Sequence, residues 1–492
     1  MALNTLSKSL SNSLQVALRK ELILQDQPDA SLCISSAFGQ LTFKCLTPGL
    51  RAAFTTLKEG KATVDELSES VLTADGGEAL TRFYYHFDQL LTRGWLQHTV
   101  VASGVAIATI VSISPSYRFH WRDLDLDRPY QLSRFAYCRR EDEHLVLESP
   151  VGHTQIILHD WRATALIALL AQPQSIRQLR GYLAGINDEV VAGCLQLLLN
   201  AEALTTVFAD GGDSEDSNLT LAQWDFHDLV FHSRSRYGRH ANLFGANFRH
   251  INRIQPLPAV KPSPEGPKID LYQPELAQLQ ANDPPLGYVM ETRRSVYTYD
   301  TKPITLQQLG EFLYRVARVR TLSEISVQAA NGYGKEVMQV SSRPYPAGGK
   351  CYDLEFYLTI DQCEGLPSGL YHYEPLQHQL TRLRERDRFV ESLLNYAIIA
   401  ARQSNPQVLI TLAARFQRIS WKYDAIAYAT TLKHVGVVYQ TMYLVATAMN
   451  LAPCALGSGD SDMFAAAAKT DYFAETSVGE FILGSLPKPH QS

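Results

Sequence analysis

The feature that most constrains this chain is a long uncharged stretch near its C-terminus. It begins after Lys433 and His434 and runs to a group of small residues between Pro453 and Gly459. Apolar residues recur in it at spacings of three and four, which is typical of a helix with a strong apolar face: Leu432, Val435, Val438, Met442, Val445 and Met449. The opposite side carries Val437, Tyr443 and Leu444. A helix that is apolar all round is either buried or spans a membrane.

A membrane span needs about 20 mostly apolar residues. Four polar residues interrupt the stretch (Gln440, Thr441, Thr447 and Asn450), and the chain offers no second candidate span. The sequence therefore predicts a core helix, shared with a second copy of the chain, that ends in a small-residue turn from Pro453 to Gly459.

The composition is that of an ordinary globular protein. A length of 492 residues indicates two to four domains. The formal net charge is −5 without a sustained basic run, which argues against nucleic acid as the main partner. The seven cysteines lie far apart without a Cys-x-x-Cys pair, so we expect no metal site and a reducing compartment. The first twenty residues lack the apolar block of a secretory signal, so we expect the cytoplasm.

The first half of the chain contains a weak duplication. A hairpin signal at Phe38–Gln40 precedes three helical patterns that end near Leu96, and a second hairpin signal at Val151–His153 precedes three more that end near Leu204. This order is that of a winged-helix unit, so we expect one repeat in residues 1–110 and another in 111–210. The repeats are either plain helical modules or peptide-binding units that accept a strand at a hairpin edge. DNA binding is the weakest option, since basic residues are not in excess.

Residues 211–268 are expected to form a linker. Five prolines between Pro256 and Pro267 hold its last part extended. One further domain is expected to occupy residues 269–492.

Two motifs in this last domain could bind a ligand. Arg293, Arg294 and Ser295 offer two guanidiniums and a hydroxyl for a phosphate, although surface arginine pairs often bind nothing. After a predicted helix at Thr305–Arg320, the loop from Ser341 to Gly349 is rich in proline and small residues and precedes a predicted strand at Leu354–Ile360. Such a loop lets backbone approach a flat ring, and a plain tight turn explains the same composition.

Several common motifs are missing. Gly332-Tyr333-Gly334 lacks the third glycine and the flanking pattern of a dinucleotide-binding loop. A Walker loop, a His-Glu-x-x-His helix and a nucleophile elbow are also absent from the sequence.

A third motif, Trp421-Lys422-Tyr423, leads into the apolar helix and Gly457. Taken in order with Arg293-Arg294-Ser295 and Pro346-Ala347-Gly348-Gly349, it resembles the flavin-dependent nitroreductase superfamily. The Lys-Tyr pair narrows the resemblance to azoline oxidases of ribosomal-peptide biosynthesis, and the two repeats make the chain most similar to the cyanobactin thiazoline oxidases. The resemblance covers residues 269–487 well and the first 210 residues more loosely.

The resemblance implies an α+β domain with an antiparallel sheet flanked by helices, which works as an intertwined homodimer and binds FMN at the subunit interface. Arg293, Arg294 and Ser295 would hold the phosphate and ribityl chain, with Tyr297 near a carbonyl edge of the ring. Ser342, Pro346, Ala347, Gly348 and Gly349 would lie along the isoalloxazine. Ala455, Leu456 and Gly457 would present backbone amides near the hydride-accepting nitrogen.

Two departures from the family pattern stand out. The family often has serine where this chain has Ala347. Simple nitroreductases also carry basic residues near the C-terminus for the phosphate, and the last 30 residues of this chain offer no assignable counterpart.

The implied reaction converts an azoline ring of a peptide to an azole, which removes a proton from one carbon and a hydride from its neighbour. Flavin accepts hydrides, so the protein must supply a base, orientation and exclusion of water. Lys422 and Tyr423 both have ordinary pKa values of about 10. We expect the ammonium to favour the phenolate and partial burial to favour the neutral amine, so that the pair acts as one acid–base unit at a helix start or in a loop. Arg415 and Arg418 would add positive potential.

The repeats are expected to bind the peptide substrate, and oxygen is the electron acceptor that the family suggests. The alternatives are an NAD(P)H-dependent nitroreductase or quinone reductase, a flavin-free peptide-binding scaffold, and a winged-helix regulator.

Overall fold

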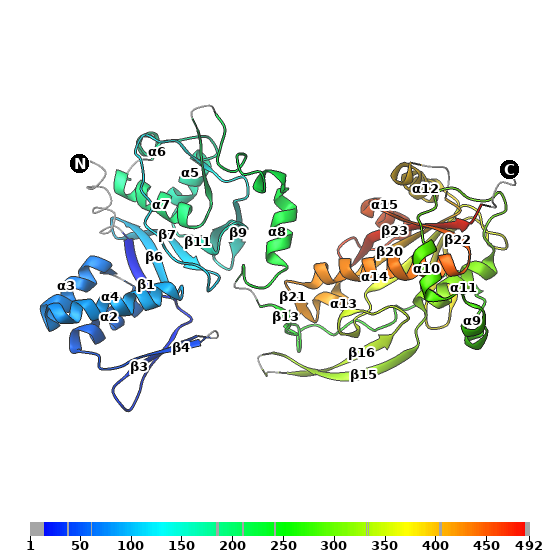
Figure 1. Cartoon of the computed structure of the whole chain (residues 1–492), viewed down its shortest axis with the longest axis horizontal. Helices are drawn as coiled ribbons and strands as arrows, with labels where there is room; N and C mark the ends of the chain where they lie inside the picture. The colour runs from blue at the N-terminus through cyan, green and yellow to red at the C-terminus, as the bar shows by residue number, and fades with distance from the viewer. Residues whose placement is uncertain are drawn as a thin grey trace. The chain divides into compact units, whose positions relative to one another are not determined.

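The computed structural model describes residues 14–487, apart from 37–38, 61, 184–185, 209–210, 241–242, 331, 333 and 403–405. The chain divides into two compact units, one up to residue 241 and the other from residue 242 (Figure 1). They are called unit 1 and unit 2 below.

Unit 1 is built on a seven-stranded antiparallel sheet with the strand order β5-β1-β6-β7-β11-β10-β9. Its strands are β1 (Leu14–Leu18), β5 (Ala62–Thr63), β6 (Leu96–Ala102), β7 (Val105–Ser112), β9 (Tyr137–Glu141), β10 (His144–Glu148) and β11 (Thr154–Leu158). Two smaller sheets accompany it: β2 (Ile23–Asp26), β3 (Leu32–Ser36) and β4 (Gly39–Phe43), and the pair β8 (Tyr130–Leu132) and β12 (Leu204–Thr206).

The helices of unit 1 confirm the two predicted sets of three. The first set is α2 (Pro48–Glu59), α3 (Val64–Asp75) and α4 (Gly77–Thr92), and the second is α5 (Trp161–Leu169), α6 (Ile176–Tyr182) and α7 (Asp188–Asn200). The short η1 (Leu221–Gln223) and α8 (Phe226–Arg234) follow. The middle helix of each set begins with a capping box, Thr63 with Glu66 and Ser175 with Gln178. Phe38 and Lys61, which the duplication includes, lie outside the described residues.

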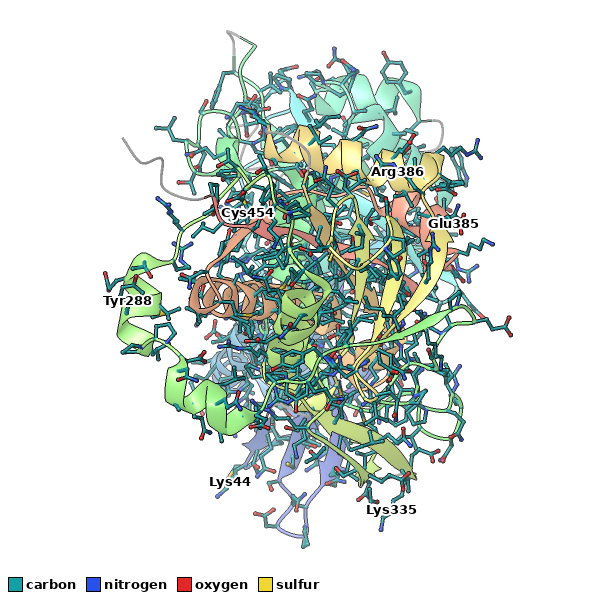
Figure 2. The ribbon with its side chains drawn as sticks, turned by 90° about the vertical axis from the view of Figure 1, so that its right-hand side faces the viewer. Lys44, Tyr288, Lys335, Glu385, Arg386 and Cys454 are labelled. Atoms are coloured by element: carbon teal, nitrogen blue, oxygen red, sulfur yellow. The ribbon has the colours of Figure 1, made fainter. Side chains whose placement is uncertain are left out.

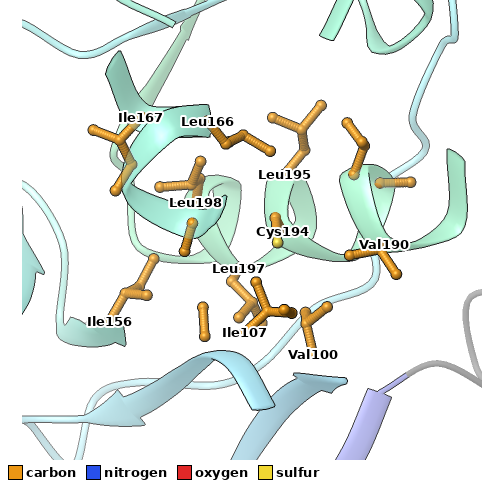
Figure 3. Close-up of a cluster of buried hydrophobic side chains, with 14 of the residues drawn as sticks. Val100, Ile107, Ile156, Leu166, Ile167, Val190, Cys194, Leu195, Leu197 and Leu198 are labelled. Atoms are coloured by element: carbon orange, nitrogen blue, oxygen red, sulfur yellow. The ribbon is translucent and has the colours of Figure 1, made fainter. Parts of the chain in front are cut away.

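One sheet serves both helical sets, because β7 pairs with β11 along its length. The division of the repeats at residue 110 therefore falls within a continuous sheet and stays a proposal. The larger core of unit 1 lies between this sheet and the second set of helices. Leu166, Leu195 and Leu198 of α5 and α7 pack in one cluster with Val100 and Ile107 of the strands (Figure 3).

Unit 2 contains a second seven-stranded sheet, antiparallel throughout, with the order β14-β19-β18-β17-β20-β23-β22. Its strands are β14 (Lys268–Asp270), β17 (Leu354–Ile360), β18 (Gly369–Glu374), β19 (Gln379–Glu385), β20 (Val408–Arg415), β22 (Leu451–Leu456) and β23 (Glu475–Ser485). Two ribbons stand beside it: β15 (Thr321–Gln328) with β16 (Lys335–Ser342), and β13 (Gly245–Ala246) with β21 (Tyr423–Asp424).

Helices cover both faces of this sheet, which confirms the predicted α+β class. They are α9 (Leu276–Asn282), α10 (Leu286–Thr292), α11 (Leu306–Ala317), α12 (Arg388–Ala401), α13 (Phe416–Ser420), α14 (Ala427–Ala448), α15 (Ser461–Ala468) and the short η2 (Gly348–Lys350). The side chains of β17 alternate between two cores. Phe356 and Leu358 pack with α11 and α14, while Tyr357 packs with α12 and α15.

The long helix predicted from the apolar stretch is α14. Its inner face, with Val435, Val438 and Met442, is buried against the sheet. Its outer face is less covered than predicted, and Leu432 is 38% exposed. Among the residues that the structure describes, α14 included, no helix is long and apolar enough to cross a membrane.

Three predicted boundaries were wrong. Pro453 to Leu456 lie in β22, and the predicted turn is confined to the connection after Leu456. A proline is tolerated there because β22 is at the edge of the sheet. Ser341 and Ser342 belong to β16 and not to the loop. The helix predicted to reach Arg320 ends at Ala317, because β15 begins at Thr321.

The proline-rich part of the linker is confirmed as a segment without helix or strand, from residue 247 to 267. It is nevertheless anchored to unit 2. Lys261 Nζ donates to Glu475 Oε2 at 2.6 Å and to the Tyr357 hydroxyl at 2.8 Å. This partly buried ion pair holds the linker against unit 2.

Glu480 is a buried carboxyl in the sheet of unit 2. It pairs with Leu456 across β22 and β23, and its carboxyl group lies against the connection after β22, where a Cβ on Gly459 would approach it to 2.1 Å. Burial raises the pKa of Glu480 to about 7. The folded protein therefore holds this proton more tightly than the unfolded chain does.

We predict that this proton makes the stability depend on pH. Both states are protonated at low pH, and the free energy of unfolding falls by about 3 kcal/mol as the pH rises from the unfolded pKa of about 4.5 to the folded pKa of about 7. Glu480→Gln should flatten this slope in urea unfolding, whereas Glu385→Gln, whose side chain is 83% exposed, should leave it unchanged. An unaltered slope in Glu480→Gln would contradict the assignment.

Candidate functional site

The loop between β16 and β17 ends in the tight turn η2. Gly349 in this turn has a φ of 58°, in the left-handed region. A Cβ at Gly349 would lie 2.2 Å from Lys422 Nζ and 2.5 Å from the Tyr423 hydroxyl. Both the backbone conformation and the space therefore require glycine here.

Lys422 and Tyr423 lie between α13 and α14, which confirms the expected position in a loop or at a helix start. Lys422 Nζ donates to the carbonyl of Gly349 at 3.2 Å and lies 5.5 Å from the centre of the Phe248 ring. Tyr423 pairs with Ala246 in the ribbon β13–β21. The two side chains are half-buried, and their polar atoms converge above Gly349. The structure therefore brings the Lys-Tyr pair and the small-residue loop together.

Burial raises the pKa of Tyr423, and the neighbouring Cys351 thiol adds to this shift. The phenol is therefore protonated at neutral pH. This direction is opposite to that of the expected phenolate, because burial favours the uncharged phenol.

The segment before this pair is held by buried contacts. Trp421 is buried against β16, and its indole N–H donates to the carbonyl of Ile254 at 2.7 Å. The buried Arg418 guanidinium donates to the carbonyls of Leu257 and Gln339.

The two arginines expected to supply positive potential have other partners. Arg415 is paired with Glu355 at 3.3 Å, which offsets its charge. Two nitrogens of the Arg418 guanidinium donate to backbone carbonyls, which ties α13 to its neighbours.

Two buried residues contact the loop that were not predicted from the sequence. The amide of Gly348 donates to His434 Nε2 at 2.7 Å, and His434 Nδ1 lies 2.6 Å from Asp353 Oδ1. Thr431 donates to the other carboxylate oxygen of Asp353 at 2.6 Å. The available signal was a histidine and a threonine three residues apart on an otherwise apolar helix, since buried polar groups require partners.

The Arg-Arg-Ser motif follows α10 and lies near the other end of α14. The Arg293 guanidinium is 5.1 Å from the centre of the Tyr443 ring, and Ser295 Oγ is 2.8 Å from the Tyr443 hydroxyl. The same hydroxyl accepts the amide of Ala455 at 2.8 Å. Tyr297 joins this group, where a hydrogen bond with Cys454 raises its pKa.

This second cluster is suited to an anionic ligand with a flat ring. In the described part of the chain, neither Arg293 nor Arg294 forms an ion pair. Gly457 follows the cluster at the end of β22, and nothing lies within 4 Å of the position its Cβ would take. Two uncompensated guanidiniums and an open approach to backbone fit a phosphate with an adjoining planar group.

The two clusters are separated within one chain. Thr430 beside Gly348 and Tyr443 beside Ser295 lie thirteen residues apart on α14, which corresponds to about 20 Å along its axis. The predicted site residues therefore form two groups. Lys422 and Tyr423 lie with Gly348 and Gly349, which Pro346 and Ala347 precede in the same loop, and Ser342 ends β16 before that loop. Arg293, Ser295 and Tyr297 lie with Ala455, and Arg294, Leu456 and Gly457 adjoin them in the chain.

Three family models match successive parts of the chain. The model "ThcOx helix turn helix domain" matches residues 10–121, "Cyanobactin oxidase ThcOx" matches 130–241, and "Nitroreductase family" matches 290–484. Two of these models describe the cyanobactin oxidases, and the third describes the nitroreductase family. The matches confirm the resemblance stated from the sequence, and they indicate an oxidoreductase with an N-terminal helix-turn-helix domain and a C-terminal nitroreductase fold.

Individual proteins similar to this chain cover about half of it or less. The nitroreductase-like protein MJ1384 of Methanocaldococcus jannaschii is 24% identical over 39% of this chain and 86% of its own length. A nitroreductase-like structure from Anabaena variabilis is 20% identical, with a TM-score of 0.36, over 52% of this chain and 45% of that one. The Escherichia coli microcin synthetase McbBCD, bound to truncated pro-MccB17, is 18% identical, with a TM-score of 0.32, over 45% of this chain and 85% of that one.

We predict that Gly349→Ala displaces Lys422 and Tyr423 and lowers oxidase turnover by about 10-fold or more, since small misplacements at a reacting centre are costly. The left-handed conformation should also cost about 1 kcal/mol of stability. Gly365→Ala is the matched control, because Gly365 has a φ of 87° and its added Cβ would meet only the Leu306 Cβ at 3.5 Å. Equal turnover in the two variants would contradict the placement.

Proposed function

We propose that this protein uses FMN to oxidise azoline rings, thiazolines above all, to azoles within a ribosomally made peptide, with oxygen as the terminal electron acceptor. The observation that carries the proposal is the convergence of Lys422 Nζ and the Tyr423 hydroxyl above Gly349. A titratable pair held over a glycine turn, in a domain matched by the nitroreductase family, supplies the proton transfer that the oxidation requires.

The residues present fit FMN. Arg293, Arg294 and Ser295 would hold the phosphate and ribityl chain, and the open backbone at Gly457 leaves room for the ring. The two glycines of the turn, Gly348 and Gly349, carry no side chains, so a planar ring could also lie against the backbone there. Bound flavin would supply hydride acceptance. The rest of the chemistry belongs to the protein.

The chain's own task is to remove a proton from carbon and keep water away. We assign proton removal to the Lys422–Tyr423 pair acting as a unit, because the polar atoms of both side chains converge above Gly349. The Tyr423 hydroxyl, directed to the same point above Gly349, orients the substrate ring and donates a hydrogen bond to it. Trp421 and Phe248 close the side of the pair away from the loop.

The separation of the two clusters supports a homodimer. We propose that the loop and Lys-Tyr pair of one copy complete the site with the Arg-Arg-Ser cluster of the other. The outer face of α14 supports this arrangement, because Leu432 is exposed and an added Cβ at Gly436 would meet nothing within 4 Å. The neighbouring α10 exposes Tyr288 (Figure 2) and Met290. An apolar face of this kind is suited to burial against a second copy.

We further propose that unit 1 binds the peptide. An azoline ring is a small part of a peptide and offers the flavin site little area. In the described residues of unit 1, β9 pairs only with β10, so its other edge is open to strand addition.

The alternative is a nicotinamide-dependent nitroreductase, which the nitroreductase match at residues 290–484 favours. Rapid oxidation of NADH or NADPH coupled to reduction of a nitroarene would support it. Azole formation without a nicotinamide would exclude it as the main activity.

We predict that Lys422→Ala and Tyr423→Phe each lower kcat for azole formation by about 10²–10⁴-fold, the usual contribution of a positioned acid or base. Flavin content, read from the visible absorbance, should be unchanged, because neither side chain lies in the Arg-Arg-Ser cluster. Sustained turnover with bound flavin in both variants would show that the pair is not catalytic.

We predict that two inactive variants complement each other. Arg293→Ala/Arg294→Ala and Lys422→Ala each disable one cluster, and their co-expression yields mixed dimers in which one site has both clusters intact. Azole formation should therefore return in the mixed dimer. Inactive mixed dimers, isolated through two different affinity tags, would place each complete site within a single chain.

We predict that removal of residues 1–241 raises KM for a long azoline peptide far more than for a minimal azoline. The reason is that the peptide loses its docking surface while the flavin domain is retained. Flavin binding serves as the control for folding. Equal losses on both substrates would assign unit 1 a purely structural role.

A further inference from the structure

We propose that Asp353 and His434 form a positioning pair, which holds the loop at Gly348 so that Lys422 and Tyr423 meet above Gly349. The inference rests on the proposed function for its catalytic consequence. Its structural part is that one tautomer of the buried His434 holds the loop, and this rests on contacts within unit 2.

The tautomer of His434 follows from its partners. The backbone amide of Gly348 can only donate, so His434 Nε2 must accept from it at 2.7 Å and carries no proton. Nδ1 therefore carries the proton and donates it to Asp353 Oδ1 at 2.6 Å. Asp353 has no exposed surface and His434 is 4% exposed, so water does not compete for either bond.

This arrangement gives His434 a role other than that of a base. Its single lone pair is engaged by a backbone amide, and its N–H faces a carboxylate that Thr431 also binds, at 2.6 Å. Neither nitrogen is free to reach a substrate. The imidazole therefore acts on the site through the loop and qualifies as a positioning residue.

The two hydrogen bonds that hold the loop lie on adjacent residues. Gly348 gives its amide to His434, and the next residue gives its carbonyl to Lys422 Nζ at 3.2 Å. The turn is thus held on one side by α14 and on the other by the lysine of the candidate pair. Without the first contact, the Gly349 carbonyl no longer has a fixed place, and a shift of about 1 Å at a reacting group costs about 10²-fold in rate.

Asp353 selects the tautomer. As a carboxylate it only accepts hydrogen bonds, which forces the proton onto Nδ1. An asparagine removes the charge that holds the proton on Nδ1, and with its N–H turned toward Nδ1 it favours the other tautomer, whose Nε2–H faces the Gly348 amide donor to donor. Asp353→Asn should therefore release the loop with almost no change in the volume of the core.

The test compares Asp353→Asn, His434→Ala and His434→Gln with a matched control. In His434→Gln, the side-chain oxygen can accept the Gly348 amide, so partial rescue relative to alanine is expected. The control is His372→Gln, because His372 and Glu355 form another fully buried histidine–carboxylate pair, at 3.2 Å, between the strands β18 and β17.

Two measurements on flavin-free full-length protein test whether Asp353 and His434 hold the loop, independently of catalysis. Nitrogen-15 shifts of the His434 ring should show the Nδ1–H tautomer in the wild type and its loss in Asp353→Asn. Hydrogen–deuterium exchange at residues 348–350 should be slow in the wild type and in His372→Gln, and faster in Asp353→Asn and His434→Ala. Unchanged exchange in His434→Ala would overturn the proposal.

Kinetics on the flavin-loaded enzyme then separate positioning from stability. Asp353→Asn and His434→Ala should lower kcat by about 10²-fold with little change in KM, with His434→Gln between them and the wild type. His372→Gln should lose stability and keep its kcat. Fast loop exchange with unchanged kcat would overturn the positioning role, whereas a wild type that oxidises no azoline but shows a protected loop would overturn only the proposed function.

Discussion

The burial of one face of α14 against the sheet of unit 2 is the constraint on which the candidate site depends. Val435, Val438 and Met442 fix the helix over β17 and its neighbours. Near its start, α14 then presents His434 to the loop at Gly348, and near its end Tyr443 to Ser295 and Ala455. The helix α14 therefore positions both clusters of the site, and a change in its packing would displace both clusters.

The helices and strands of unit 2 were predictable where the apolar spacing in the sequence agrees with the side chains that the fold buries. The apolar stretch after His434 predicted α14, and the alternation at Leu354–Ile360 predicted β17. Local patterns failed at Pro453 to Leu456, where small residues suggested a turn and the edge of a sheet tolerated them as a strand. In unit 1, the six helices were visible from their spacing, while the shared sheet was not, because strand pairing is a long-range property.

The candidate site was predictable as a set of motifs but not as an arrangement. The order of Arg293, Gly349 and Lys422 along the chain indicated one family, yet only the fold shows that the first lies about 20 Å from the other two along α14. The pair Asp353 and His434 was missed because a lone aspartate and a lone histidine, eighty-one residues apart, carry no local signal. The protonated state of Tyr423 depends on burial, which sequence spacing does not report.

We propose that Lys422 and Tyr423 handle the proton of an azoline oxidation for which bound FMN would supply hydride acceptance. The decisive experiment follows the visible absorption spectrum of the purified full-length protein, in the absence of oxygen, while an azoline peptide is added. We expect a yellow protein whose flavin band bleaches as azole appears in equal amount and returns on admission of oxygen. A colourless protein, or a flavin band that persists with the peptide bound, would contradict it.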